Sequence, residues 1–450
     1  MNEFFSMAAR WFFGPEVMAL LFIIAVVITA RLGWVQFRRF GSAWSESWGA
    51  IRAGMGRRVG DKLGSFQAGM VAMGATVGMG NVVGVGVAIS AGGPGAIFWL
   101  WVAGLFLMAV KFAEATLAVH FRRTFEDGSV SGGSPFYLAR GLGMPWLGTM
   151  LAVFAGLVAF GPGNVAQMSA LAPVLEQGFG WPIGIVALAT MILAIVILAG
   201  GVRRVAGFMV WAVPLAILAF LVLALVVILG RVEAIPTAFV QIFQGAFSFQ
   251  AAAGGAAGGA IVAAFHAGVS RGVFATEAGL GSSGFAYAQA DVDHPVRQGF
   301  WGVFEVFVST FLIMTLSALV FLTAGDFDPN TATLSLLTQA FALGQFGVPI
   351  MSILVAIFSF TTLISWGFYG EEAARYLAGD VIRWPYRMAY AVIAFVAAPG
   401  LLAAVLPAAD FLVGLMLIPH MIALAFLSYR VLPGLVKSFF EGEIWRPPAD

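Results

Sequence analysis

The sequence predicts an all-α polytopic membrane protein whose helices pack closely or break, and its composition carries the prediction. Of the 450 residues, 61% are apolar and only 10% are charged, whereas soluble proteins carry about 45–50% apolar and about 25% charged residues. The 56 glycines exceed what plain helical bundles need. A net charge of +1 leaves no basic excess, which excludes a nucleic-acid-binding protein. The chain has no cysteine, which excludes disulfides, thiolate metal sites and cysteine nucleophiles.

Eleven apolar stretches are long enough to be transmembrane helices, since a helix needs about 20 residues to cross the hydrocarbon core. The expected spans are residues 12–30, 66–91, 95–119, 147–174, 182–200, 206–229, 246–288 (interrupted), 299–324, 348–370, 387–405 and 408–430. The first has the length of a full span rather than of a signal-peptide core, so we expect an extra N-terminal transmembrane helix. Residues 31–64 carry Trp and Phe at helical spacing among Arg and Ser. They predict an amphipathic helix at the inner interface, with a simple linker as the alternative.

The distribution of Lys and Arg predicts the orientation of these spans. With residues 31–64 placed inside, 19 of the 23 Lys and Arg residues lie on the inner side. Arg10 and Arg231 lie outside, and Lys111 and Arg271 lie within spans. By the positive-inside rule, we expect a multi-pass protein of the cell (inner) membrane with its N-terminus outside and its C-terminus in the cytoplasm.

Glycines interrupt the second span. Gly74, Gly78 and Gly80 lie mid-membrane, where each costs up to about 1 kcal/mol against Ala in a helix. Small-residue helix packing is the alternative, because Gly74 and Gly78 are four residues apart. Packing does not account for Gly80 and Asn81 following at once. The pattern therefore predicts an unwound turn, which a membrane protein tolerates only where the turn faces protein or a cavity.

The seventh span is also interrupted and carries charge. It contains Gly254-Gly255, Gly258-Gly259 and then Glu277 to Ser283, with Arg271 six residues before Glu277. Charged residues within a span are functional or paired by default. A structural pair between Arg271 and Glu277 is the alternative to a functional site.

The two interruptions predict an internal repeat. They lie about 200 residues apart and open two blocks of five spans, 2–6 and 7–11. An odd number of spans per block inverts the second block, and paired interrupted spans are typical of inverted-repeat transporters. The expected divisions are residues 1–64 (extra and interfacial helices), 65–230 (first repeat), 231–432 (second repeat) and 433–450 (cytoplasmic tail).

The broken spans offer exposed backbone groups that can bind the charged ends of a solute. Free N–H groups near Gly78, Met79 and Gly80 open a half-helix and attract a carboxylate. Asn81 can donate to that carboxylate or coordinate a cation. Carbonyls freed around Phe274–Thr276 can accept hydrogen bonds from an ammonium group.

Several longer motifs resemble the alanine/glycine:cation symporter family, over about residues 60 to 430. The resemblance rests on Ala75–Asn81, Gly92–Trp101, Lys111–Glu114, Gly161–Gln167, Arg271–Phe274, Glu277–Ser282, Asp293–Gly299 and Trp366–Glu371. It implies a sodium-coupled amino-acid symporter with the leucine-transporter-like five-plus-five fold and one extra N-terminal helix. Met79 and Thr276 stand where the family usually has Thr and Asn, so a neutral amino acid other than alanine or glycine is the alternative substrate.

The resemblance also implies site residues. The substrate residues are Thr76, Gly78, Met79, Gly80, Asn81, Gln167, Phe274, Thr276 and Trp366. An interhelical hydrogen bond is the alternative for Gln167, and packing is the alternative for Trp366. The coupling Na⁺ is expected at the hydroxyls of Thr361 and Thr362 and the carbonyls of Gly74 and Val77, although the two threonines could simply bond their own helix.

Other classes of function fit the sequence less well. We find no nucleophile–base pair or metal constellation for an enzyme, and no symmetric ring of groups for a channel. A proton-coupled amino-acid carrier of the same fold, with Glu277 or Glu305 titrating, is the closest rival. Glu305 has no partner evident from the sequence, whereas Lys111 and Glu114 are three residues apart on one helix and can pair. The expected partners are a small neutral amino acid, sodium and the lipid bilayer, and the sequence leaves the oligomeric state open.

Overall fold

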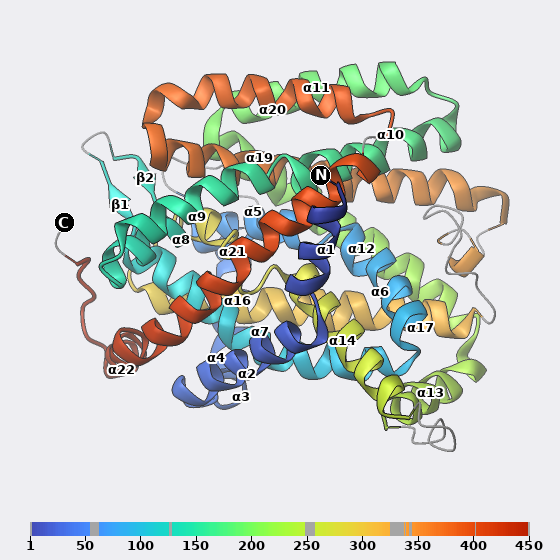
Figure 1. The fold of residues 1–450 in the computed structure, drawn as a ribbon, viewed down its shortest axis with the longest axis horizontal. Coiled ribbons are helices and arrows are strands. Elements are labelled where there is room, and N and C mark those ends of the chain that lie inside the picture. Colours follow the sequence, from blue (N-terminus) through green and yellow to red (C-terminus); the bar gives the residue numbers. More distant parts are fainter. Residues whose placement is uncertain are drawn as a thin grey trace.

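A computed structural model describes residues 2–54, 63–125, 128–247, 257–324, 337, 339–341, 344–400 and 402–448. In this part of the chain, seven helical stretches are long and apolar enough to cross a membrane. They are Ser65–Gly92, Gly95–His120, Pro145–Phe179, Gly201–Leu229, Pro295–Thr323, Gly347–Ala378 and Pro407–Arg430. The molecule is therefore a multi-pass helical membrane protein, with most of its long helices packed roughly along one direction (Figure 1).

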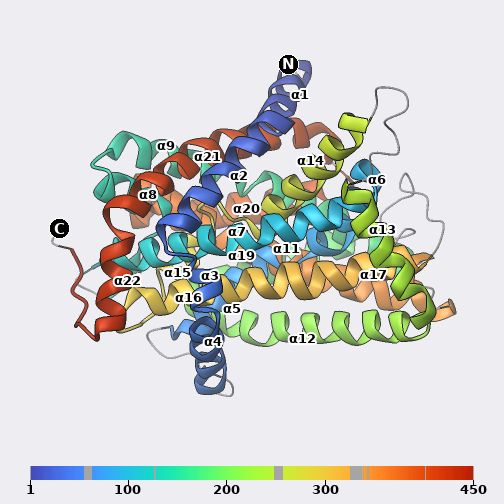
Figure 2. The same ribbon diagram turned by 90° about the horizontal axis from the view of Figure 1, so that it is seen from below.

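The N-terminal part wraps the outside of this bundle. Its helices are α1 (Asn2–Phe12), α2 (Pro15–Arg31), α3 (Val35–Arg38) and α4 (Phe40–Gly54). Figure 2 shows α1 and α4 projecting on opposite sides of the molecule, with α2 running between them. Helix α4 falls where an interfacial helix was expected. It exposes Trp44 and Trp48 in part, while the Trp44 ring also packs edge-on against Phe304.

The middle of the chain forms the first set of long helices. In order, the elements are α5 (Ser65–Thr76), α6 (Met79–Gly92), α7 (Gly95–His120), β1 (Arg123–Thr124), β2 (Val130–Ser131), α8 (Ser134–Phe136), the π-helical η1 (Tyr137–Gly141), α9 (Pro145–Val158), the π-helical η2 (Gly161–Val165), α10 (Ala166–Phe179), α11 (Ile183–Ala199) and α12 (Gly201–Leu229). The two strands pair antiparallel, with Arg123 opposite Ser131.

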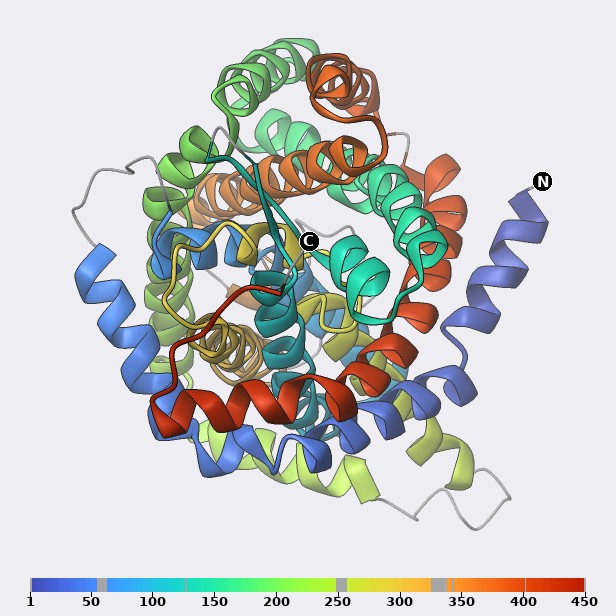
Figure 3. The same ribbon diagram turned by 90° about the vertical axis from the view of Figure 1, so that its left-hand side faces the viewer.

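The remaining elements form the second set. They are η3 (Val232–Ala234), α13 (Ile235–Phe247), α14 (Ala257–Thr276), α15 (Gly284–Tyr287), α16 (Pro295–Val306), the π-helical η5 (Phe307–Met314), α17 (Thr315–Thr323), η6 (Gly344–Phe346), α19 (Gly347–Ala378), η7 (Asp380–Ile382), α20 (Arg383–Ala397), α21 (Leu402–Arg430) and α22 (Leu432–Glu441). Figure 3 shows the molecule from one side, with several of the long helices seen nearly end-on.

Four expected spans fall on helices outside the seven. Helices α2, α11, α14 and α20 occupy the positions predicted for spans one, five, seven and ten. Helix α14 begins at Ala257, and the Gly254-Gly255 pair lies outside the described residues. The first part of the expected tail, residues 433–450, lies in helix α22. This helix buries Leu432 and Leu435 against the bundle.

The predicted break in the second span is present. Helix α5 ends at Thr76 and α6 begins at Met79, and the two residues between them are extended, with Val77 at φ −94° and Gly78 at φ −160°. Close packing explains two of the glycines. A Cβ on Gly74 would lie 2.7 Å from the Ser365 hydroxyl, and one on Gly78 would lie 2.9 Å from the Thr362 hydroxyl.

The predicted break in the seventh span is present too, and it is longer. Helix α14 ends at Thr276 and α15 begins at Gly284. Between them Glu277, Gly279 and Gly281 have φ values of 53°, 95° and 76°. A left-handed backbone suits glycine and is uncommon for glutamate, so Glu277 is held there by its surroundings.

Helix α7 brings the two breaks together. It packs against α6, α14 and α16 in the centre of the molecule. Its C-terminal half is buried from Leu107 to Val119, including the charged residues Lys111 and Glu114. The second break therefore lies against a helix that carries charge into the core.

Candidate functional site

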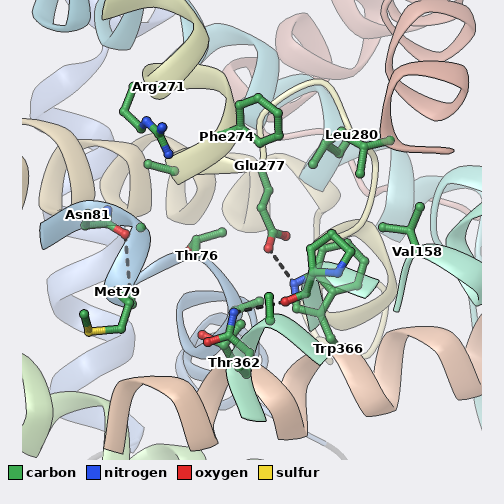
Figure 4. Close-up of a pocket in the computed structure, with 18 of the residues that line it drawn as sticks. Thr76, Met79, Asn81, Val158, Arg271, Phe274, Glu277, Leu280, Thr362 and Trp366 are labelled. Carbon is green, nitrogen blue, oxygen red and sulfur yellow. Dashed lines mark hydrogen bonds between the residues drawn. The ribbon is translucent and has the colours of Figure 1, made fainter. Parts of the chain in front are cut away.

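A cavity of about 390 Å³ lies between the two breaks. Its wall is formed by the break regions together with α9, η2, α10, α19 and α21 (Figure 4). The lining residues are Ala75, Thr76, Gly78, Met79, Gly80, Asn81, Val158, Pro162, Ala166, Gln167, Arg271, Phe274, Ala275, Glu277, Leu280, Thr362, Trp366, Asp410 and Val413. A mostly apolar wall with a few convergent polar groups is typical of a site for a small molecule.

The first break supplies polar backbone and one side-chain donor to the cavity. Thr76, Gly78, Met79, Gly80 and Asn81, all predicted as substrate residues, line it. The side-chain Oδ1 of Asn81 accepts the Gly78 N–H at 3.2 Å, which caps α6. The Asn81 side-chain nitrogen is buried and has no hydrogen-bond partner in the described part of the chain. A buried amide nitrogen without a partner costs free energy, so this atom is suited to receive an acceptor from a bound molecule.

The opposite wall carries Gln167 and Trp366, as expected from the sequence. The Gln167 amide donates to the Pro162 carbonyl at 3.0 Å, which is a bond within its own helical run. Gly163 lets Trp366 approach, since a Cβ there would lie 2.3 Å from the Trp366 Cβ. The Trp366 indole N–H donates to a Glu277 carboxylate oxygen at 2.9 Å, so the wall is tied to the second break.

Next to the second break, Phe274 of α14 lines the cavity, but Thr276 is absent from the lining and lies behind the wall. The Thr276 hydroxyl donates to the Gly272 carbonyl at 2.7 Å. The Thr276 carbonyl accepts from the Lys111 ammonium at 2.7 Å. The structure therefore brings together all the predicted substrate residues except Thr276, whose carbonyl already has a cationic partner.

The residues predicted to bind sodium lie beside the first break. The Thr362 hydroxyl lines the cavity and donates to the Gly74 carbonyl at 3.2 Å. The Thr361 hydroxyl donates to the Phe358 carbonyl of its own helix at 3.0 Å. Val77 is buried in the extended turn. Gly74 and Thr362 are thus in contact, and Thr361 makes the local bond that was its alternative.

Three charged side chains line the cavity. Arg271 and Glu277 do so, as does Asp410 of α21, a residue the sequence reasoning did not single out. Glu277 is bonded by Trp366 and by the Ser282 hydroxyl at 2.6 Å. Arg271 interacts electrostatically with Asp410. Arg271 and Glu277 thus have different partners. The sequence signal for Asp410 is a single acidic residue near the start of an apolar span, and this signal could have marked it as a candidate site residue.

Behind the second break, the local pair expected between Lys111 and Glu114 gives way to longer-range contacts. Lys111 forms an ion pair with Glu305 at 3.3 Å. Glu114 accepts the backbone N–H groups of Gly279 at 2.8 Å and Gly281 at 3.1 Å. The spacing of Lys111 and Glu114 along one helix did not predict these contacts. The backbone amides of the unwound segment compete with Lys111 for the Glu114 carboxylate.

The fold and the cavity define a class: a multi-pass membrane protein with a cavity between two helix breaks, an arrangement typical of secondary transporters. The chain belongs to the sodium:alanine symporter family, whose sequence profile matches residues 1–442. This is a family of transporters rather than of enzymes, and the resemblance seen in the sequence motifs is confirmed.

Known relatives extend over nearly the whole chain. The sodium/alanine symporter AgcS of Methanococcus maripaludis is 36% identical over 437 residues, covering 95% of each chain. The probable sodium/glutamine symporter GlnT of Bacillus subtilis is 32% identical and covers 93% of this chain and 87% of its own. A crystal structure of an Eremococcus coleocola manganese transporter mutant is similar in fold, with a TM-score of 0.54, 13% identity, and coverage of 83% of this chain and 76% of its own.

Proposed function

We propose that the protein is a sodium-coupled symporter that imports a small neutral amino acid, such as alanine or glycine, by alternating access. The observation that carries the proposal is the buried Asn81 amide nitrogen, which has no partner among the described residues, at the wall of a cavity that also contains the Glu277 carboxylate. A donor and an anion in one enclosed site are what the two ends of a zwitterion require. Membership of a family of sodium:alanine symporters supports it.

The substrate carboxylate is proposed to bind at the start of α6. Gly78, Met79 and Gly80 line the cavity there, and the first turn of a helix presents N–H groups and the positive end of the dipole. The Asn81 nitrogen adds a side-chain donor. Arg271, on α14, brings positive charge to the same cavity.

The substrate ammonium is proposed to bind on the second break. The carbonyls of Phe274–Thr276 were the expected acceptors, and the Thr276 carbonyl is already bonded to Lys111. Glu277 lines the cavity and retains acceptor capacity, because a carboxylate has about four lone-pair sites and this one accepts two bonds. We therefore assign the ammonium to Glu277 and to the Phe274 region, with Gln167 and Trp366 enclosing the side chain.

Sodium is proposed to bind where Gly74, Val77, Thr361 and Thr362 meet the first break. Carbonyl and hydroxyl oxygens freed at a broken helix are typical ligands of a coupling ion. The contact between the Thr362 hydroxyl and the Gly74 carbonyl supports this position. An ion there fixes the unwound turn, so sodium and substrate strengthen each other's binding by linkage.

The proposal includes the layout of the chain in the membrane. We propose eleven spans, arranged as repeats at residues 65–230 and 231–432 after an extra helix, in the cell (inner) membrane with the N-terminus outside. One sodium ion crossing about 100 mV releases about 2.3 kcal/mol. A tenfold concentration gradient adds roughly 1.4 kcal/mol, which together can drive accumulation of several hundredfold.

Uptake by purified protein in proteoliposomes tests the proposal. Labelled alanine, glycine, serine and glutamine are offered under a sodium gradient, a lithium gradient or a proton gradient alone. We expect alanine or glycine to accumulate with sodium. Uptake that follows protons and ignores sodium would instead establish the proton-coupled carrier, and uptake of glutamine alone would change the substrate.

A further inference from the structure

Lys111 lies between the two ends of the second break. Its side chain is fully buried. The ammonium group donates to the Thr276 carbonyl at 2.7 Å and to the Ser283 hydroxyl at 2.6 Å. Thr276 ends α14 and Ser283 directly precedes α15, so a single amine joins the two sides of the gap.

The third contact of Lys111 leads to the first break. The ammonium lies 3.3 Å from a Glu305 oxygen, and this carboxylate is itself only 1% exposed. The same oxygen accepts the Thr76 hydroxyl at 2.8 Å, and the Tyr287 hydroxyl donates to the other oxygen. Thr76 is the last residue of α5. Two side chains therefore connect the first break to both ends of the second.

The ligands around the ammonium are those that a bound metal cation would use at a broken helix: a carbonyl at a helix C-terminus, a hydroxyl and a carboxylate. The ammonium donates two hydrogen bonds, to the Thr276 carbonyl and the Ser283 hydroxyl, and forms an ion pair with Glu305. Because the cation is covalently attached to α7, it cannot leave during a transport cycle. A permanent cation can hold the second break in shape whether or not sodium is bound.

From this geometry we propose that Lys111, acting through Glu305, is a built-in cation that positions the two helix breaks relative to each other. The inference rests on the proposed transport function and goes beyond it. Lys111 is a positioning residue, because it lies behind the cavity wall and is absent from the lining. Its removal should release the second break and weaken substrate binding rather than merely slow the conformational change.

A double-mutant cycle tests this separately from stability. Lys111→Met leaves Glu305 buried without its cation, and Glu305→Gln leaves Lys111 without its anion, so each single variant should melt at a lower temperature. The double variant removes both charges of this pair and should regain part of the melting temperature. We expect the double variant still to have an alanine KM raised at least about tenfold, since the charge-assisted contacts that join the breaks stay lost. Recovery of KM together with melting temperature would overturn the proposal.

A second readout does not depend on transport. The chain has no cysteine, so an introduced Leu280→Cys is the sole thiol and reports on the second break. We expect a small thiol reagent to label it at least about tenfold faster with Lys111→Met, as local opening becomes easier. Ala194→Cys, buried on α11, serves as the control for general loosening. Equal labelling rates of Leu280→Cys with and without Lys111 would overturn the proposal, even if the transport assay showed a different coupling ion.

A surface variant controls for loss of a lysine as such. Lys437 forms an exposed i,i+4 pair with Glu441 at 3.7 Å, well away from the breaks. Lys437→Met should leave both the alanine KM and the labelling of Leu280→Cys unchanged, because exposed pairs contribute little. A change in Lys437→Met as large as that in Lys111→Met would contradict a specific role for the buried amine.

Discussion

The two helix breaks are built differently. The first is two residues long, and the cap from Asn81 comes from its own helix. The second spans residues 277–283 and is bonded by side chains from several helices. Those side chains are Lys111 and Glu114 of α7, His420 of α21 and Trp366 of α19.

This difference suggests that the two breaks have different roles in binding. Three backbone groups of the second break have side-chain partners without any ligand, since Glu114 accepts two amides and His420 lies 2.6 Å from the Gly279 carbonyl. The first break keeps the unpartnered Asn81 nitrogen at the cavity wall. We therefore expect the second break to act as a fixed wall and the first as the part that ligands complete.

The largest effect is expected from removing the anchor of the second break. Glu114→Ala takes the acceptor from two buried amides, and a hydrogen bond to a charged group is worth about 1.5–3 kcal/mol. We expect stability to fall by about 3 kcal/mol or more, measured as a lower melting temperature in detergent. Glu114→Gln, which keeps one acceptor oxygen, is the control and should fall less. A Glu114→Ala protein as stable as the wild type would show that the second break needs no anchor.

Asn81→Ala should damage the first break without unfolding the protein. It removes the cavity donor and the α6 cap, worth together about 2–5 kcal/mol at the site. Sodium-driven alanine uptake should fall about 100-fold or to background, while the melting temperature without ligand changes little. Uptake at the wild-type rate would remove Asn81 from the substrate site.

The two neighbouring threonines of α19 should differ in their effect on sodium. Thr362 touches the Gly74 carbonyl at the break, whereas Thr361 bonds its own helix. We expect Thr362→Val to raise the half-saturating sodium concentration about tenfold, the size of one lost oxygen ligand or hydrogen bond, and Thr361→Val to raise it less. Sodium titration of alanine uptake measures both. A larger effect from Thr361→Val would move the ion away from the cavity wall.

The smallest effect is the difference expected between alanine substitutions of two glycines at the first break, Gly78 in the break and Gly80 in the first turn of α6. A Cβ on Gly78 would lie 2.9 Å from the Thr362 hydroxyl, whereas a Cβ on Gly80 meets nothing within 4 Å. Gly78→Ala should therefore weaken sodium activation, while Gly80→Ala should be tolerated and gain up to about 1 kcal/mol of helix stability. Sodium titrations and melting curves of the two variants decide this. Equal loss in both would show that the space at Gly80 is used by the substrate.

The sequence predicted both breaks because their signals are local. Glycines and Asn81 within one apolar run, and Glu277 within another, are costly in a continuous membrane helix. The neighbours of each break were not predictable in the same way. The ion pair of Lys111 with Glu305 and the electrostatic interaction of Arg271 with Asp410 join residues far apart in the chain and depend on how the helices pack.

The position of Thr276 shows a further limit of sequence reasoning. The sequence placed its carbonyl in an unwound segment, and the structure has Thr276 as the last residue of α14, directly before the break. Whether a freed carbonyl faces the cavity or a buried lysine depends on the direction in which the chain turns.

The sequence also did not predict two short amphipathic helices. Helices α13 and α22 carry too few apolar residues in a row to stand out among long spans.

Binding of alanine as a function of sodium tests the central claim most directly. If both ligands complete the first break, sodium should tighten alanine binding to the purified protein about 5–150-fold. Alanine should tighten sodium binding by the same factor, and both couplings should vanish in Asn81→Ala. An alanine affinity that is equal in sodium and in potassium would contradict a site shared by ion and substrate.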